Sequence, residues 1–311
     1  LDGSAKENLA ISQAEIEAAC AQISPEQKSA LQLAIDRVRK FHEAQPVTSW
    51  FSQKMGGTLG QLVRPIQRVG LYIPAGSAPL PSSLLMSAVP AQVAGVKEIV
   101  LAAPPQRSTG SIHPIILATA SMLGITEIYA MGGSQAIGAL AFGTETIRKV
   151  DKIFGPGNIF VTLAKRQVYG VVGIDSLAGP TETVVIADDS ANPAWVAADL
   201  LAQAEHDALA SAILLTPSQA LVSKVQEEIK NQVAQRTRKD IIATSLKNRS
   251  GIVLTRDIAE AVELANEYAP EHLCLSVTDP WSWIDRIVAA GGIFLGENSF
   301  EVLGDYVAGP S

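Results

Sequence analysis

The chain has 311 residues, of which 47% are hydrophobic and 18% are charged, and its formal net charge is -7. This length allows two domains of roughly 150 residues each, and the composition excludes a disordered chain. The acidic balance, without a basic stripe, argues against a nucleic-acid partner. No apolar run approaches the ~20 residues that cross a bilayer, so we expect no membrane segment.

The two cysteines, Cys20 and Cys274, lie far apart and fit no metal or disulfide spacing. This usage is typical of a reducing compartment. We therefore expect a cytoplasmic protein, with a plastid as the alternative if the source is a plant. Because the chain opens on Leu1 and not on Met, the loss of a signal or transit peptide stays open.

Residues 1–60 are predicted to form an N-terminal helical arm, with two helices over 5–45. Ser24 precedes Pro25, and Gln27 follows three residues after Ser24, which is the pattern of a capped helix start. The apolar residues that then recur at helical spacing are Leu31, Ile35, Val38 and Phe41. The arm carries no visible chemistry, so we interpret it as packing or dimer-forming.

From Val69 onward, short apolar strand candidates alternate with helical stretches. The strands expected in the first series are 69–73, 98–103, 127–131 and 149–154, with helices over 82–95, 112–123 and 134–142. The strands expected in the second series are 183–188, 211–216, 251–255, 273–277 and 291–296, with helices over 193–206, 218–236, 257–267 and 281–289. Such alternation predicts an α/β fold with mainly parallel, doubly wound sheets. We place the two domains at 61–180 and 181–311.

Three glycine-containing loops follow strands of the first series, at 74–83, 131–140 and 154–160. Loops at the carboxyl ends of parallel strands are where doubly wound folds bind ligands. None of the three is a G-x-G-x-x-G fingerprint, and glycine at such turns is also ordinary turn chemistry. The presence of three such loops in the first half of the chain nevertheless favours a ligand-binding site at that edge of the sheet.

The stretch "APEHL" places Glu271 and His272 directly before an apolar strand. A carboxylate beside an imidazole at a strand edge can form a general acid/base pair, although spacing alone favours an exposed turn. Cys274 follows within the alternating "LCLSV". A nucleophilic thiol is one reading of Cys274, and a small buried hydrophobe is the better supported one.

The stretch "LLAQAEHD" closes an apolar helix and holds one of four histidines in the chain. Gln203 and His206 are three residues apart and share a helix face, so together they could hold one metal ion. Glutamine is an uncommon zinc ligand, and the spacing arises readily by chance. From spacing alone, a solvated helix end is the default interpretation.

Seven blocks occur in order along the chain: "VGLYIPAGSAPLPSSLLMSAVPAQVAGVKEIVLAAPP", "GGSQAIGALAFGT", "GPGNIFVTLAKRQV", "AGPTETVVIAD", "DLLAQAEHD", "YAPEHL" and "GDYVAG". Taken together and in this order, they resemble histidinol dehydrogenases over residues 30 to 311. The resemblance implies oxidation of L-histidinol through L-histidinaldehyde to L-histidine, the last two steps of histidine biosynthesis, with two NAD and one water. It also implies a zinc-dependent homodimer built on two incomplete Rossmann-like domains.

The same resemblance implies roles for nine residues. The expected zinc ligands are Gln203, His206 and Asp305. The expected catalytic pair is Glu271 and His272, in which His272 takes the hydroxyl proton and Glu271 activates water. The expected NAD contacts are Tyr72, Gln135 and Asn158. The expected substrate contacts are Thr181, Gln203, His206, His272 and Asp305. Thr181 stands where many members carry serine, and we expect the contact to survive because threonine keeps the hydroxyl.

One departure concerns the C-terminal tail domain. In the family, that tail supplies a histidine as the fourth zinc ligand and a glutamate that contacts the substrate. This sequence ends at Ser311. Its two remaining histidines, His42 and His113, lie in N-terminal segments. We therefore expect the 311-residue form to be a fragment, or a protein whose tail is lost, and to bind zinc weakly or not at all and be inactive. Tight stoichiometric zinc binding would contradict this expectation.

Two alternatives to histidinol oxidation stay open. A related zinc- and NAD-dependent dehydrogenase could act on another small alcohol, such as a sulfonated diol, with the same metal and NAD machinery. A non-catalytic homologue could keep the fold without turnover. The joint presence of Glu271, His272, Gln203, His206 and Asp305 argues against the second alternative.

Overall fold

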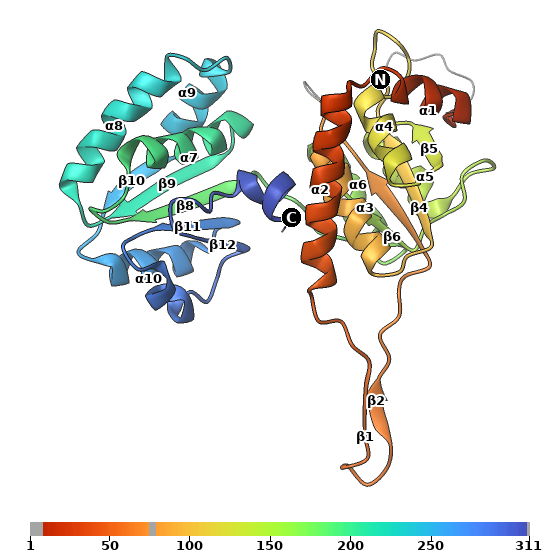
Figure 1. Cartoon of the computed structure of the whole chain (residues 1–311), viewed down its shortest axis with the longest axis horizontal. Coiled ribbons are helices and arrows are strands. Elements are labelled where there is room, and N and C mark those ends of the chain that lie inside the picture. Colours follow the sequence, from red (N-terminus) through yellow and green to blue (C-terminus); the bar gives the residue numbers. More distant parts are fainter. Residues whose placement is uncertain (1–8, 75–78, 310–311) are drawn as a thin grey trace. The chain divides into compact units, whose positions relative to one another are not determined.

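The computed structural model describes residues 9–74 and 79–309. Its contacts divide the chain into two compact units, residues 1–178 with 304–311 and residues 179–303. Each unit holds one five-stranded sheet in which every neighbouring pair of strands is parallel, so the expected α/β fold is confirmed (Figure 1). The three-domain division at 1–60, 61–180 and 181–311 stays a prediction.

The first unit has the sheet order β5-β4-β3-β6-β7. Its parallel strands are β3 (Arg68–Tyr72), β4 (Glu98–Ala103), β5 (Glu127–Ala130), β6 (Lys152–Phe154) and β7 (Gly173–Ile174). Its helices are α1 (Gln13–Cys20), α2 (Pro25–Glu43), α3 (Pro81–Val93), α4 (Pro114–Met122), α5 (Gly133–Phe142), α6 (Ile159–Val168) and the π-helix η2 (Gly304–Ala308). A hairpin of β1 (Trp50–Ser52) and β2 (Leu59–Gln61) extends away from the rest of this unit (Figure 1).

The second unit has the order β10-β9-β8-β11-β12, so the strand that comes first along the chain is central, as β3 is in the first unit. Its strands are β8 (Glu182–Ala187), β9 (Ser211–Thr216), β10 (Gly251–Leu254), β11 (His272–Ser276) and β12 (Gly292–Leu295). Its helices are α7 (Pro193–His206), α8 (Gln219–Val233), α9 (Lys239–Asn248), α10 (Ile258–Tyr268) and the 3-10 helix η1 (Pro280–Arg286). The two sheets therefore repeat one strand order, a likeness that the sequence shows only as a similar rhythm.

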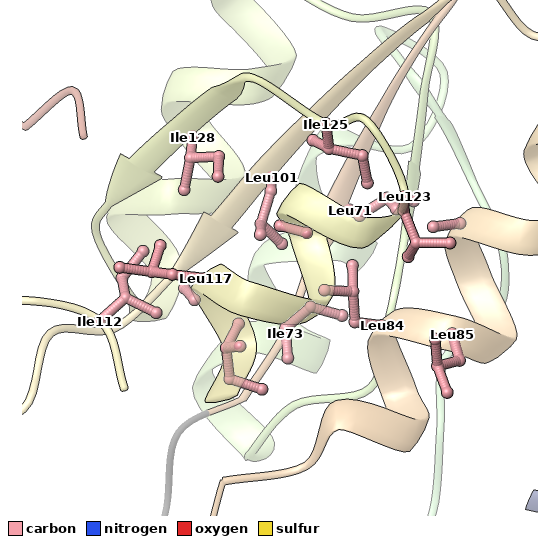
Figure 2. Close-up of a cluster of buried hydrophobic side chains, with 14 of the residues drawn as sticks. Leu71, Ile73, Leu84, Leu85, Leu101, Ile112, Leu117, Leu123, Ile125 and Ile128 are labelled. Atoms are coloured by element: carbon pink, nitrogen blue, oxygen red, sulfur yellow. The ribbon is translucent and has the colours of Figure 1, made fainter. Parts of the chain in front are cut away.

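The central strands of both sheets are buried on both faces, as is typical of parallel sheets. In the first unit, successive residues of β3 point to opposite faces of the sheet and belong to different hydrophobic clusters. Leu71 packs with helices α1 to α4, whereas Tyr72 packs with α5 and α6. Figure 2 shows the first of these clusters, to which Leu71, Leu101 and Leu117 all belong. Complete burial of each such side chain contributes about 1.5–3 kcal/mol.

The N-terminal helices belong to this same core. Ser24 accepts a hydrogen bond from the backbone of Gln27, whose side chain bonds back to Ser24, so the capped start predicted for α2 is confirmed. Leu31, Ile35 and Val38 of α2 are buried in the cluster that covers one face of the first sheet.

Some sequence expectations differ from the structure. The helix expected over 218–236 is shorter and is followed by a separate helix, α9, while the helix expected over 281–289 is the 3-10 helix η1. The β1–β2 hairpin and α6 were not predicted at all. Among the described residues, no helix is long and apolar enough to cross a membrane.

Candidate active site

The side chains predicted to carry catalysis gather at the amino-terminal edge of the second sheet. Thr181 directly precedes β8, and Glu271 and His272 lie at the start of β11, which pairs with β8. Helix α7 follows β8 and crosses back to the start of β9, so its last turn, ending at His206, returns to the edge where the strands begin.

A chain of hydrogen bonds connects three of these side chains. The Thr181 Oγ1 donates to Glu271 Oε2 at 2.6 Å and accepts from Gln203 Nε2 at 2.8 Å. Gln203 is only 3% exposed, and a buried amide without a partner would cost about 1–3 kcal/mol. Thr181 therefore satisfies the amide of a predicted zinc ligand and orients a predicted catalytic carboxylate with one hydroxyl.

The backbone of the Glu271–His272 pair is fixed by the chain on either side. Helix α10 ends at Ala269, whose φ of 55° lies in the left-handed region, and Pro270 then leads directly into the pair. The N–H groups of Gly291 and Gly292 donate to the carbonyl oxygens of Pro270 and Glu271, at 3.0 and 2.8 Å. A Cβ on Gly291 would lie 2.7 Å from the Glu271 carbonyl oxygen, so this close approach requires glycine.

The imidazole of His272 lies against a second carboxylate. Its Nδ1 is 3.1 Å from Oε2 of Glu301, and the Thr183 Oγ1 donates to the same oxygen at 2.7 Å. Glu301 was not among the predicted site residues, because "NSFEVLG" carries no motif that relates it to a histidine 29 positions earlier.

Cys274 lies two residues beyond His272 on β11 and is buried. Burial, together with the carboxylates of Glu301 and Asp199, raises the pKa of the thiol well above its usual value. A thiol held in its protonated form is a poor nucleophile. The structure therefore supports the interpretation of Cys274 as a small buried hydrophobe.

Asp199 of α7 is a further carboxyl group near Glu301 that sequence patterns did not indicate. Burial raises its pKa to about 7, and the negative charges of Glu301 and Glu297 act in the same direction. Asp199 lies one helical turn before Gln203, so this acid belongs to the same helix as two predicted zinc ligands. Near neutral pH, the cluster can hold a proton that an exposed aspartate would have lost.

The two predicted ligands on α7 both lie in its last turn, where Gln203 is buried and His206 is exposed. Asp305, the third, falls within η2 of the first unit, and its side chain lies outside the described residues. Within the described part of the chain, no group of three or more His, Cys, Asp or Glu side chains could hold a metal ion.

The predicted NAD contacts lie at the carboxyl-terminal edge of the first sheet. Tyr72 ends β3, Gln135 lies in the first turn of α5 after β5, and Asn158 caps α6 after β6. The Tyr72 hydroxyl accepts a hydrogen bond from the Gly133 N–H at 3.2 Å. The candidate loop at 74–83 includes residues 75–78, which lie outside the described residues.

The loop after β6 is held closely against Tyr72. Gly155 has a φ of +117°, and a Cβ there would lie 1.9 Å from the Tyr72 carbonyl oxygen, so only glycine fits. The buried Lys165 donates to the Gly155 carbonyl at 2.5 Å and to Asp175 at 2.6 Å, while Asp175 accepts from the Gly155 N–H at 2.8 Å. This ion pair fixes the loop that presents Asn158.

Asn158 is oriented by its capping role. Its Oδ1 accepts hydrogen bonds from the backbone N–H groups of Phe160 and Val161, at 3.0 and 3.2 Å. The amide nitrogen is therefore the end of the side chain left to donate to a ligand. Tyr72 contacts both this loop and the loop of Gln135, so the three predicted contacts lie at one edge of the sheet. Tyr72 and Asn158 lie after β3 and β6, the two strands between which the strand order reverses.

Comparison with known proteins identifies the family. The sequence model described as histidinol dehydrogenase matches residues 1–311. This chain belongs to the histidinol dehydrogenase family. The histidinol dehydrogenase of Moorella thermoacetica is 54% identical over 302 residues, which cover 97% of this chain and 71% of that protein. That of Deinococcus radiodurans is 51% identical over 313 residues, covering 100% of this chain and 71% of that protein.

Solved structures agree with the histidinol dehydrogenase assignment. The crystal structure of histidinol dehydrogenase from Elizabethkingia anophelis has a TM-score of 0.96 and 45% identity, and the match covers 99% of this chain and 71% of that one. An acetylating aldehyde dehydrogenase from Geobacillus thermoglucosidasius matches with a TM-score of 0.57 and 14% identity, covering 97% of this chain and 85% of that one. The second likeness shows a shared fold alone.

Proposed function

We propose that this chain oxidises L-histidinol through L-histidinaldehyde to L-histidine, with NAD and zinc, in the last two steps of histidine biosynthesis. The observation that carries the proposal is the hydrogen-bonded chain from Gln203 through Thr181 to Glu271, beside His272, in a member of the histidinol dehydrogenase family. This arrangement joins a metal-ligand candidate, a hydroxyl and an acid/base pair on one sheet edge.

Zinc would be held by Gln203, His206 and Asp305. The donor set fits in the part that the structure describes, because the Gln203 nitrogen donates to Thr181 and leaves the amide oxygen for a cation. His206 follows on the same helix face with its ring exposed. When bound, zinc would act as a Lewis acid that orients the imidazole and amino nitrogens of the substrate.

NAD would be held by Tyr72, Gln135 and Asn158. Three features support this assignment: the position at the carboxyl edge of the first sheet, the closely held Gly155 loop, and the free amide nitrogen of Asn158. When bound, NAD would accept the hydride that leaves the carbinol carbon in each of the two oxidations.

His272 and Glu271 would move the protons. In the first oxidation, His272 accepts the hydroxyl proton of the alcohol as the carbinol carbon loses its hydride. In the second, Glu271 removes a proton from the water that adds to the aldehyde carbon. Thr181 donates to only one oxygen of Glu271, which leaves the other oxygen to face that water. The same Thr181, with Gln203, His206, His272 and Asp305, would contact the substrate.

We also propose a homodimer in the cytoplasm. Exposed apolar side chains of the β1–β2 hairpin support the dimer: Val47, Trp50, Phe51, Met55, Leu59 and Leu62. A two-stranded hairpin is marginally stable in water by itself. A partner subunit would supply the apolar packing surface that the hairpin's own unit does not provide. Both cysteines are free thiols, which is consistent with a reducing compartment.

The test is substrate selectivity of the full-length protein with zinc and NAD. We expect NADH formation from L-histidinol at least tenfold faster, in kcat/KM, than from sulfonated diols or other small alcohols. The His272→Asn variant should lose the first oxidation while retaining zinc. A preference for another alcohol would favour the related dehydrogenase, and no turnover of any alcohol would favour a non-catalytic homologue.

A further inference from the structure

Glu301 places a largely shielded carboxylate beside the proposed general base. Its side chain is 11% exposed, and its Oε2 lies 3.1 Å from the Nδ1 of His272. Thr183 donates to the same oxygen at 2.7 Å. His272 of β11 and Thr183 of β8 are direct register partners, so one carboxylate oxygen lies over two adjacent strands.

The carboxylate of Glu301 lies on one face of β11. Cys274, two residues from His272, points to the same side of the strand, and the charge of Glu301 contributes to the raised pKa of its thiol. The ring of Phe294 packs edge-on against the imidazole, with centroids 5.9 Å apart. The carboxylate is thus fixed by the fold and does not belong to a freely moving surface chain.

The other candidate partner of the imidazole is already engaged. Glu271 is next to His272 in the sequence, but its Oε2 accepts from Thr181 at 2.6 Å and faces the Glu182 N–H at 3.4 Å. The two carboxylates therefore have separate partners: Glu271 with the Thr181 hydroxyl, and Glu301 with the ring.

We propose that Glu301 is a positioning residue that holds the proton of His272 on Nδ1, so that Nε2 is the basic nitrogen facing the substrate. This inference rests on the proposed function. A neutral imidazole has one N–H and one lone pair, and a carboxylate only accepts, so the nitrogen beside Glu301 carries the hydrogen. When the substrate hydroxyl proton moves to Nε2, the negative charge of Glu301 stabilises the imidazolium, and the Nδ1 proton stays on the ring.

The present contact is short but poorly aligned. The His272 Nδ1 is shielded from solvent and makes no hydrogen bond of good geometry with the described residues. Catalytic hydrogen bonds are often misaligned without substrate and tighten when it binds. A small ring rotation toward Glu301 would complete the bond, because burial keeps solvent from competing for this nitrogen.

The test compares Glu301→Gln with Glu297→Gln in the full-length protein. The first substitution keeps the approximate size of the side chain and removes its charge. Glu297 lies on the same segment but accepts from the Asn192 backbone, so it is a matched control. We expect Glu301→Gln to lower kcat about 10²–10⁴-fold with little change in the KM for NAD, and Glu297→Gln to stay within about threefold of the unchanged protein.

Two further readouts separate positioning from a structural role. The acidic limb of the kcat/KM profile should move to lower pH in Glu301→Gln, because the imidazolium loses its counter-charge. The titratable groups that interact with this carboxylate include, within the described residues, His272, Asp199 and Cys274. Thr183→Val, which keeps the carboxylate and removes its donor, should lose less than about tenfold in kcat. If Glu301→Gln does not fold, the test uses Thr183→Val and Glu301→Asp instead. Both variants retain the negative charge at position 301.

The tautomer of His272 provides a readout without turnover. Nitrogen NMR can assign this ring by comparison with a His272 variant. We expect the hydrogen on Nδ1 in the unchanged protein and a mixed tautomer in Glu301→Gln. Equal kinetics and pH profiles for Glu301→Gln and Glu297→Gln, or a hydrogen on Nε2 in the unchanged protein, would overturn the inference. Absence of histidinol oxidation by the unchanged protein would instead reject the proposed function.

Discussion

At the scale of single residues, Thr181 is the connection on which the candidate site depends. Its hydroxyl accepts from one predicted zinc ligand and donates to one predicted catalytic carboxylate. The resemblance to the family implies a substrate contact at this position but not these two bonds, because Thr181 and Gln203 are 22 positions apart and Thr181 and Glu271 are 90 apart.

Replacing this hydroxyl should separate its role from that of the methyl group. We expect Thr181→Val to lower kcat/KM for histidinol by about 10–10²-fold, because the buried Gln203 amide loses its acceptor and Glu271 loses its donor. Thr181→Ser keeps both bonds and should stay within about threefold. Steady-state kinetics of both variants provide the measurement, and equal losses in the two would contradict the account.

Gly291 offers a second test at this scale. Gly291→Ala would force the backbone at Glu271 to shift, because the new Cβ would lie 2.7 Å from its carbonyl oxygen. We expect a loss of about 1–3 kcal/mol in the free energy of unfolding and a lower kcat. Gly251→Ala is the matched control, since a Cβ there meets nothing within 4 Å. Denaturant unfolding and kinetics compare the two, and equal behaviour would reject a requirement for glycine at 291.

Asp199 predicts a pH dependence of stability. Its pKa of about 7 in the folded chain lies above the ~3.9 of an unfolded aspartate. Its contribution to stability is therefore complete below about pH 4 and is lost as the pH rises through about 7. Asp199→Asn should flatten this part of the profile, by at most about 4 kcal/mol, in denaturant unfolding between pH 4 and 8. The exposed Asp285→Asn should leave the slope unchanged, and an unchanged slope in Asp199→Asn would contradict the assignment.

At the scale of elements, the two sheets share one strand order, yet the predicted residues use opposite edges. The NAD candidates follow the ends of β3, β5 and β6, whereas the acid/base pair precedes β11. Alternating apolar runs with glycine and proline between them made the parallel strands predictable. The edge of the second sheet that carries the site was not predictable from a general rule for doubly wound folds, which points to the carboxyl ends.

Physical reasons explain why the sequence patterns did not predict some elements and contacts. The β1–β2 hairpin has exposed apolar residues on short strands, so it shows none of the alternation expected from a half-buried strand. Helix α6 begins directly at the Asn158 cap, and its first two residues fall within the glycine-containing loop expected at 154–160. The carboxylate of Glu301 reaches Thr183 across 118 positions, a contact that no local pattern encodes.

The hairpin supports a prediction about assembly. Phe51, 63% exposed on β1, should lie in the dimer interface, so Phe51→Glu should shift the protein from dimer to monomer or weaken dimerisation at least tenfold. Thr58→Glu adds the same charge to the hairpin without removing apolar surface and should keep the dimer. Sedimentation equilibrium gives the measurement. A dimer of equal strength in both variants would exclude the hairpin from the interface.

At the scale of the whole molecule, the proposed function makes one chain responsible for two successive oxidations, using residues of both units. The first unit supplies the proposed NAD contacts, and the second supplies the acid/base pair with two metal ligands. Family membership was predictable from the ordered sequence blocks. The hydrogen bonds that connect Thr181 with Gln203 and Glu271 could be identified only from the structure. A protein that released the aldehyde after one oxidation would need only part of this machinery.

The number of NADH formed per histidinol therefore tests the central claim most directly. With limiting L-histidinol and excess NAD, the full-length zinc-loaded protein should yield two NADH and one L-histidine per substrate molecule. Glu271→Gln should slow the second oxidation more than the first, because the water loses its base. One NADH per histidinol with accumulation of aldehyde, or no NADH at all, in the unchanged protein would contradict the account.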